Sequence, residues 1–156
     1  MLEYPNVVVF RTFSKMYGLA ALRVGYLCGS LEVVEVIRKT HVVYSVNTLG
    51  QRAAAAAVED DGEFIAATRA MVAEDKAMLQ AEFDNLGLPW ICGQGNFIMV
   101  RIPMSDTLLY RRLAKKGLLV RTMTGFRFPG WIRVSLVRRP VMEEFCQVLR
   151  DVLRGK

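Results

Sequence analysis

The chain has 156 residues, 53% of them hydrophobic, and a mean hydropathy of +0.24, so it can bury a core, and intrinsic disorder is excluded. Charges interrupt its apolar runs well short of the roughly 20 residues of a membrane span, and no secretion-signal pattern opens it, so we expect a cytoplasmic protein without a membrane partner. The net charge of +6 is uneven, −3 over residues 1–106 and +9 over 107–156, and no nucleic-acid-binding module accompanies it, so no nucleic-acid partner is expected.

The first 60 residues predict two strands followed by two helices. Val7–Phe10 is a continuous apolar run, typical of a strand buried on both faces, and Arg23–Cys28 predicts a second strand. Ser30 can cap a helix over Leu31–Lys39. The alanine run Ala53–Ala57 has strong helix propensity and predicts a second helix.

The remaining residues predict a long helix and then alternating strands and helices. The long helix runs from about Asp60 to Leu86, where Gly87 ends it. The elements expected after it are strands at Phe97–Ile102, Leu118–Thr122 and Ile132–Leu136, and helices at Ser105–Lys116 and Pro140–Arg154.

This order of elements predicts an α/β protein with two parts. Residues 61–156 can form a small α+β domain of their own. Residues 1–60 have too few strands for a complete α/β sheet, because a strand such as Val7–Phe10 needs parallel neighbours on both sides. We therefore expect residues 1–60 to be the C-terminal part of a larger domain.

The segment from Arg11 to Tyr26 has the residues most suggestive of chemistry. Two hydroxyls, Thr12 and Ser14, flank the end of a predicted strand, Lys15 follows, and Arg23 comes eight residues later. A lysine among apolar neighbours can act as a neutral amine that condenses with an aldehyde, while hydroxyls and a guanidinium bind a phosphate ester. An aldehyde and a phosphate on one small molecule describe pyridoxal phosphate. The plainer interpretation is a surface lysine with locally bonded hydroxyls.

Two further arginines, Arg121 and Arg133, lie inside apolar strand-like runs, where an unpaired charge is costly. We expect them to be anion receptors, and the alternative is a pair of structural arginines near a strand edge. No metal site is expected, because three distant cysteines and one histidine lack ligand spacing.

The Arg11–Tyr26 segment resembles the lysine segment of the fold-type I, class I/II pyridoxal-phosphate aminotransferases. Within them it is similar to the histidinol-phosphate aminotransferase branch, whose pattern is T-F-S-K-x-x-G-L-A-G-L-R-x-G-Y, with Ala21 in place of a glycine. The resemblance continues through Gly95-Asn96-Phe97, Gly117–Arg121 and Ile132–Leu136. It therefore covers nearly the whole chain.

The resemblance implies a role for each candidate residue. Lys15 would bind the cofactor pyridoxal 5'-phosphate covalently and move the α-proton of the substrate, while Thr12, Ser14 and Arg23 would bind the cofactor phosphate. Arg133 would bind the α-carboxylate or the equivalent polar end of the amino substrate, and Arg121 the substrate's phosphate. The implied reaction is transamination in histidine biosynthesis, between histidinol phosphate or glutamate and keto partners such as 2-oxoglutarate, in a homodimeric full-length protein.

The resemblance also implies that this chain is the C-terminal portion of such an enzyme. The family places most of its cofactor pocket upstream of the lysine, and 14 residues precede Lys15 here. We therefore expect an incomplete catalytic unit. The alternatives are a threonine-phosphate decarboxylase-like enzyme with the same cofactor, a non-catalytic assembly fragment, and a basic nucleic-acid binder.

Overall fold

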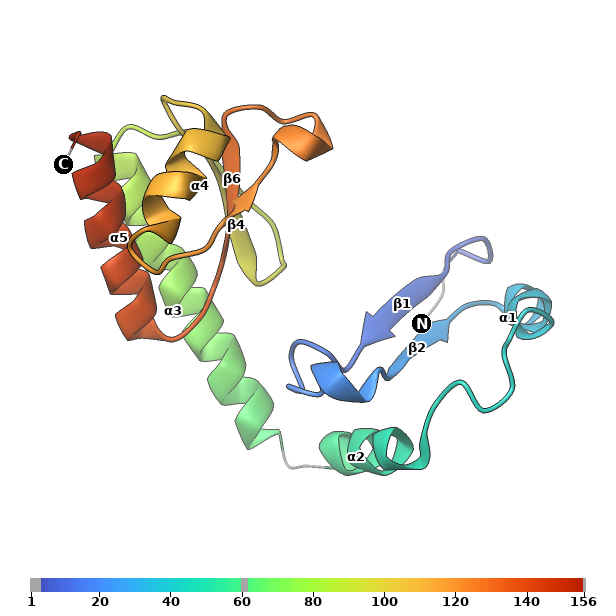
Figure 1. The fold of residues 1–156 in the computed structure, drawn as a ribbon. Helices are drawn as coiled ribbons and strands as arrows, with labels where there is room; N and C mark the ends of the chain where they lie inside the picture. The colour runs from blue at the N-terminus through green and yellow to red at the C-terminus, as the bar shows by residue number, and fades with distance from the viewer. Residues whose placement is uncertain (1–3, 60–61, 156) are drawn as a thin grey trace. The chain divides into compact units, whose positions relative to one another are not determined.

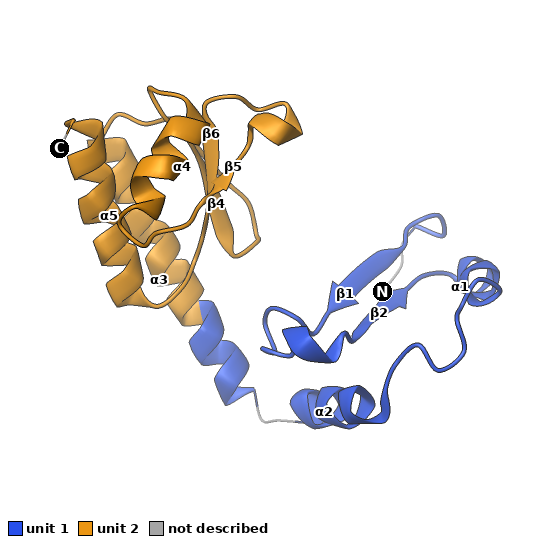
Figure 2. Ribbon diagram, viewed as in Figure 1, with its two compact units in different colours: residues 1–69 blue, residues 70–156 orange. Residues whose placement is uncertain are grey.

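The computed structural model describes residues 4–59 and 62–155. It consists of two compact units, residues 1–69 and 70–156 (Figures 1 and 2). The division falls inside a long helix, whereas the boundary expected from the sequence, 60/61, comes just before that helix and lies on residues outside the described part of the chain. The assignment of residues 1–60 to a larger domain stays a prediction.

Unit 1 contains a two-stranded antiparallel sheet and two helices. Strand β1 (Val9–Thr12) pairs with β2 (Gly25–Cys28), so that Thr12 lies opposite Gly25. Helices α1 (Leu31–Arg38) and α2 (Thr48–Glu59) follow, and a one-turn helix, η1 (Ala20–Leu22), precedes β2 (Figure 1). The two predicted helices are confirmed, and the first strand begins two residues later than expected.

The expected burial of the first strand on both faces is wrong. Val9 is partly buried, the other three residues of β1 are exposed, and 73% of Phe10 is exposed. The physical reason is that, in the described residues, β1 has β2 as its partner strand, and the buried core of this unit consists of Phe13, Val24 and Ala54. A parallel sheet that would cover both faces is not formed here.

Unit 2 is built around a four-stranded antiparallel sheet in the order β3-β4-β6-β5. The strands are β3 (Trp90–Cys92), β4 (Phe97–Arg101), β5 (Arg121–Thr122) and β6 (Trp131–Ser135). The helices are α3 (Glu63–Asn85), α4 (Asp106–Ala114) and α5 (Arg139–Leu153), with a one-turn helix η2 (Thr124–Phe126) between β5 and β6. The predicted helices and the strands β4 and β6 are confirmed, β5 keeps two of the five residues expected at Leu118–Thr122, and β3 was not predicted.

One face of this sheet forms the main core. Ile98 and Val100 of β4 and Ile132 and Val134 of β6 are almost completely buried, in a cluster with residues of α3, α4 and α5. Because strand side chains alternate between faces, Phe97 and Arg133 project from the opposite face. That opposite face is therefore available for a function other than core packing.

Among the described residues, three ion pairs connect α3 with α5 in unit 2, and the longest joins Nη2 of Arg139 to Oε2 of Glu74 at 3.6 Å. Nε of Arg139 lies 2.9 Å from Oδ1 of Asp75, which is fully buried, and Nη1 of Arg150 lies 2.7 Å from Oε2 of Glu82. A buried carboxylate inside α3 was not predicted from the sequence, since its partner lies 64 positions away. Within residues 4–59 and 62–155, every helix is too short or too polar to cross a membrane.

Candidate functional site

The loop that carries Lys15 is anchored by Phe13, whose side chain is 6% exposed. Its ring lies 4.8 Å from that of Tyr17 and 5.8 Å from that of Tyr26, measured between centroids. Its backbone N–H donates to the carbonyl of Val24, and its carbonyl accepts from the N–H of Leu19. Phe13 therefore fixes both ends of the loop that joins β1 to β2.

Lys15 lies in a tight turn and is exposed. Its carbonyl accepts a hydrogen bond from the N–H of Gly18 at 3.0 Å, and Gly18 has a φ of +68°, a conformation that glycine adopts without strain. The expected apolar surroundings of Lys15 are wrong for the described residues, because the turn leads its side chain into solvent. An exposed amine in a fixed turn is nonetheless reachable by a small aldehyde.

Thr12 and Ser14 are bonded to one another. The backbone N–H of Ser14 donates to Oγ1 of Thr12 at 3.0 Å, which holds the threonine hydroxyl at the end of β1. This local bond agrees with the plainer interpretation of the two hydroxyls. It also leaves the hydroxyl hydrogen of Thr12 available as a donor, because the oxygen acts as the acceptor.

Arg23 adopts a left-handed backbone conformation with a φ of 56°. Its Nη1 donates to the carbonyl of Ala20 at 2.7 Å, which directs the exposed guanidinium back along η1. A guanidinium has five N–H donors, so this bond leaves others for an anion.

Asn47 connects this loop to helix α2, which the sequence interpretation missed. Its Oδ1 accepts from the N–H of Gly50 at 2.7 Å, and its Nδ2 donates to the carbonyl of Leu22 at 3.2 Å. A Cβ on Gly50 would lie 2.7 Å from Cγ2 of Val24, so the helix packs closely on the strand. An asparagine just before an alanine-rich helix is a capping signal that could have identified it.

A groove of about 510 Å³ lies beside this loop in unit 1. Thr12, Tyr17, Tyr26 and Arg11 are among its lining residues, whereas Ser14, Lys15 and Arg23 are not. The structure thus brings Thr12 to a cavity that is also lined by two tyrosines and by two arginines, Arg11 and Arg69. It leaves Lys15 and Arg23 on the neighbouring surface.

In unit 2, Arg121 and Arg133 face each other across the β5–β6 pair. The expectation that both are embedded in apolar surroundings is wrong for Arg121, which is exposed because β5 is an edge strand of two residues. Arg133 is partly buried, and its Nε is buried without a hydrogen-bond partner among the described residues. Like charges at opposite positions destabilise a sheet, so this pair favours a bound anion.

Each of these arginines lies over an aromatic ring. The guanidinium carbon of Arg121 is 5.1 Å from the centroid of Phe126, and that of Arg133 is 5.1 Å from the centroid of Phe97. Sequence interpretation paired neither arginine with a ring, and the contact of Arg133 with Phe97 depends on the register of two strands far apart in the chain.

Asp106 is a second buried carboxylate in unit 2, 2% exposed. It accepts hydrogen bonds from the N–H groups of Met123 and Thr124 at 2.9 and 2.8 Å and from Oγ1 of Thr124 at 2.7 Å. Burial by itself would raise the pKa of Asp106, but these bonds, with one from the N–H of Thr107, lower it below its ordinary value. Asp106 thereby fixes the turn that connects Arg121 to Phe126.

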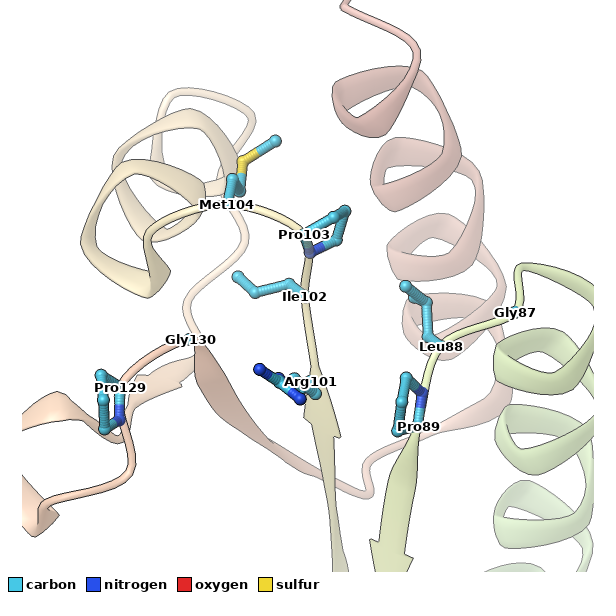
Figure 3. A pocket seen from close by; sticks show the side chains of 9 residues that line it. All are labelled: Gly87, Leu88, Pro89, Arg101, Ile102, Pro103, Met104, Pro129 and Gly130. Carbon is cyan, nitrogen blue, oxygen red and sulfur yellow. The ribbon is translucent and has the colours of Figure 1, made fainter.

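A second groove, of about 530 Å³, lies at the C-terminal end of β4, opposite to the end that carries Phe97 (Figure 3). Arg101, Pro103 and Met104 contribute to it, together with Gly87 to Pro89 and Pro129 and Gly130. The predicted site residues Arg121 and Arg133 do not line it. It is therefore separate from the arginine pair of unit 2.

The chain is similar in sequence to a known family of proteins and to several of its members. A family model described as "Aminotransferase class I and II" matches residues 1–149. Histidinol-phosphate aminotransferase from Brevibacillus brevis is 35% identical over 98% of this chain and 42% of its own length. Histidinol-phosphate aminotransferase 2 from Pseudomonas aeruginosa is 39% identical over 97% of this chain and 41% of its own length. The chain spans about two fifths of the length of these relatives.

The solved structures show the same fold. Histidinol-phosphate aminotransferase from Sinorhizobium meliloti, in complex with pyridoxal-5'-phosphate, superposes with a TM-score of 0.80 at 25% identity, over 99% of this chain and 43% of that one. L-threonine-O-3-phosphate decarboxylase from Porphyromonas gingivalis superposes with a TM-score of 0.84 at 20% identity, over 98% of this chain and 48% of that one.

Proposed function

Because this chain belongs to the class I and II aminotransferases, we propose that it is the C-terminal portion of a pyridoxal-phosphate-dependent transaminase of the histidinol-phosphate type. The observation that carries the proposal is the Lys15 turn, anchored by Phe13 and flanked by the hydroxyls of Thr12 and Ser14 and by Arg23. The reaction would transfer an amino group between histidinol phosphate or glutamate and keto acids such as 2-oxoglutarate. The whole protein would work as a homodimer in the cytoplasm.

The residues of unit 1 fit the two ends of pyridoxal 5'-phosphate. The donors of Thr12, Ser14 and Arg23 suit its phosphate, and the exposed amine of Lys15 suits its aldehyde. When bound, this cofactor supplies an electron sink that stabilises negative charge at the α-carbon of the substrate. Lys15 Nζ would hold the cofactor covalently, and its amine would act as the general base and acid that takes and returns the α-proton of the substrate.

The arginines of unit 2 suit the anionic groups of the substrate. Arg133 would bind the α-carboxylate or the equivalent polar end, since its buried Nε needs an acceptor. Arg121, exposed on the edge strand opposite Arg133, would bind the phosphate. Their facing positions support binding of an anion by both side chains.

Titration of the purified chain with pyridoxal 5'-phosphate tests the role of Lys15. We expect an absorbance band of the covalent lysine adduct that is lost in Lys15→Ala and retained in Lys39→Ala. Both lysines are exposed in unit 1, but Lys15 is the one that follows the hydroxyls of Thr12 and Ser14. A band of equal size in both variants would remove Lys15 from its role. Because the chain spans about two fifths of its relatives, we expect adduct formation without efficient turnover.

A second candidate function is a threonine-phosphate decarboxylase-like activity. It is supported by the fold of the decarboxylase from Porphyromonas gingivalis, and the two arginines suit a phosphorylated amino acid equally well. In an assay of the full-length protein, release of CO2 from threonine phosphate without glutamate-dependent amino transfer would favour this function. A chain that forms no adduct at all would instead favour a non-catalytic assembly fragment.

A further inference from the structure

Arg133 is held on the free face of the unit 2 sheet by contact with Phe97. Its guanidinium carbon lies 5.1 Å from the centroid of the Phe97 ring. Met99 of β4 is the direct partner of Arg133 across the antiparallel pair, so Phe97 is its diagonal neighbour on the same face. An arginine over the face of an aromatic ring is attracted by the negative charge of that face.

This ring contact is important because Nε of Arg133 has no protein acceptor. Nε is buried and makes no hydrogen bond within the part of the chain that the structure describes. The position of the guanidinium therefore depends on the strand backbone and on the ring of Phe97. A fixed guanidinium plane is what bidentate recognition of a carboxylate or phosphate requires.

Gly95 leaves the space that the Phe97 ring occupies. A Cβ at this position would lie 3.0 Å from Cε1 and 3.3 Å from Cδ1 of Phe97, so the ring would have to move. The backbone of Gly95 is not in the left-handed region, so its role concerns space and not conformation. Gly93, two residues earlier, would place a Cβ within 4 Å of no atom, which makes it a matched control.

We propose that Phe97 is a positioning residue for Arg133, orienting its guanidinium toward an anionic ligand, and that Gly95 is required because it leaves room for that ring. This inference gives a physical reason for the Gly95-Asn96-Phe97 segment. It rests on the proposed function only for the identity of the natural ligand. The orientation of Arg133 is a property of unit 2 and involves no cofactor.

Nuclear magnetic resonance of the full 156-residue chain tests the proposal, with inorganic phosphate as the probe. The Nε–Hε signal of Arg133 is identified by its loss in Arg133→Lys. We expect the Phe97 ring to shift this signal upfield. In Phe97→Leu the signal should move downfield and phosphate affinity at Arg133 should fall by about 2- to 30-fold, while Phe97→Tyr should restore both. An unchanged signal and affinity in Phe97→Leu, or no recovery in Phe97→Tyr, would overturn the proposal.

The glycine pair gives a second test in which the phenylalanine is retained. Gly95→Ala should shift the Arg133 signal and weaken phosphate binding in the same direction as Phe97→Leu, and Gly93→Ala should match the unmodified chain. Equal behaviour of the two alanine variants would contradict the role of Gly95, even if Phe97→Leu failed to fold. If phosphate did not change the Arg133 signal of the unmodified chain, the proposed role of Arg133 in substrate binding would be contradicted. The effect of Phe97→Leu on the position of that signal would still test whether Phe97 positions Arg133.

Discussion

The pairing of β5 with β6 places two arginines at opposite positions, an arrangement that costs a sheet stability unless the charges are compensated. In unit 2 each guanidinium lies over a phenylalanine ring, which compensates part of the charge. A bound anion would remove the remaining repulsion. The anion binding proposed for these two arginines would therefore account for their opposite positions.

Cys146 is expected to be the least reactive of the three cysteines. Burial in the α5 core, with the nearby carboxylate of Glu82, raises the pKa of its thiol to about 11. At pH 8 only about one thiol in a thousand is then the reactive thiolate. Iodoacetamide followed by mass spectrometry should modify the partly exposed Cys28 and Cys92 first. In 6 M urea, as a control, all three cysteines should react at similar rates. Modification of Cys146 in the folded chain as early as Cys28 and Cys92 would contradict the prediction.

Asp106 is expected to stabilise unit 2 in a pH-dependent way. Asp106→Asn replaces a charged acceptor of three bonds from Met123 and Thr124, so the free energy of unfolding in urea should fall by about 2–3 kcal/mol at pH 7. Because the folded-state pKa of Asp106 is lowered, its stabilisation is complete above the ordinary value of 3.8 and is lost as pH falls through the lower folded value.

The free energy of unfolding of the unmodified chain should therefore exceed that of Asp106→Asn by a constant amount above pH 5, and this excess should shrink toward pH 2. Asp151→Asn is the control, since that carboxylate is bonded by Gln147 at 3.3 Å near the surface. A difference that stays the same down to pH 2 would show that the charge of Asp106 is not responsible.

At the scale of elements, the start of α2 is fixed by Asn47. Asn47→Ala removes the cap on the Gly50 N–H and the bond to the Leu22 carbonyl, and a lost cap costs about 1 kcal/mol. We expect the amide of Gly50 to exchange with solvent about fivefold faster or more in this variant. Asn47→Asp keeps the capping oxygen and should exchange more slowly than Asn47→Ala. Equal exchange in all three proteins would contradict a capping role.

The positions of helices and strands could be predicted from local patterns, whereas the burial of some elements could not. Helix α1 begins at Leu31 and strands β4 and β6 lie close to their expected positions, because apolar periodicity is a local signal. Ser30 precedes α1 as expected, but its side chain forms no capping hydrogen bond. Burial of β1 was predicted wrongly, since it depends on neighbouring strands and not on the apolar run itself. The buried Asp75 was missed for the same reason, because Arg139 approaches it from another helix.

Part of the candidate site could likewise be predicted from the sequence, and part could not. Lys15, Thr12, Ser14 and Arg23 share one short segment, so their types and spacing indicated a chemistry directly. The contacts that support the site were not predictable, because Phe97 meets Arg133 only through the β4–β6 register. Asp106 likewise meets Thr124 across 18 positions. Long-range pairing determines which side chains support a site.

At the scale of the whole chain, the two units differ in how much core they have. Unit 2 buries a cluster of seventeen apolar residues, whereas the cluster of unit 1 has three among the described residues. Phe10, Leu31 and Tyr44 of unit 1 are between 73% and 95% exposed. Unit 1 should therefore open at a lower free energy than unit 2. The Lys15 turn belongs to the less stable unit, and a ligand bound there would stabilise that unit by an amount set by the ligand concentration relative to its Kd.

The most direct measurement is the site of covalent attachment of pyridoxal 5'-phosphate. The chain is incubated with the cofactor, reduced with borohydride, digested and mapped by mass spectrometry. We predict one dominant adduct at Lys15, because its amine is exposed beside the hydroxyls of Thr12 and Ser14. Modification spread evenly over Lys15, Lys39 and Lys76, or absent from Lys15, would contradict the assignment of this chain as the lysine-bearing portion of a transaminase.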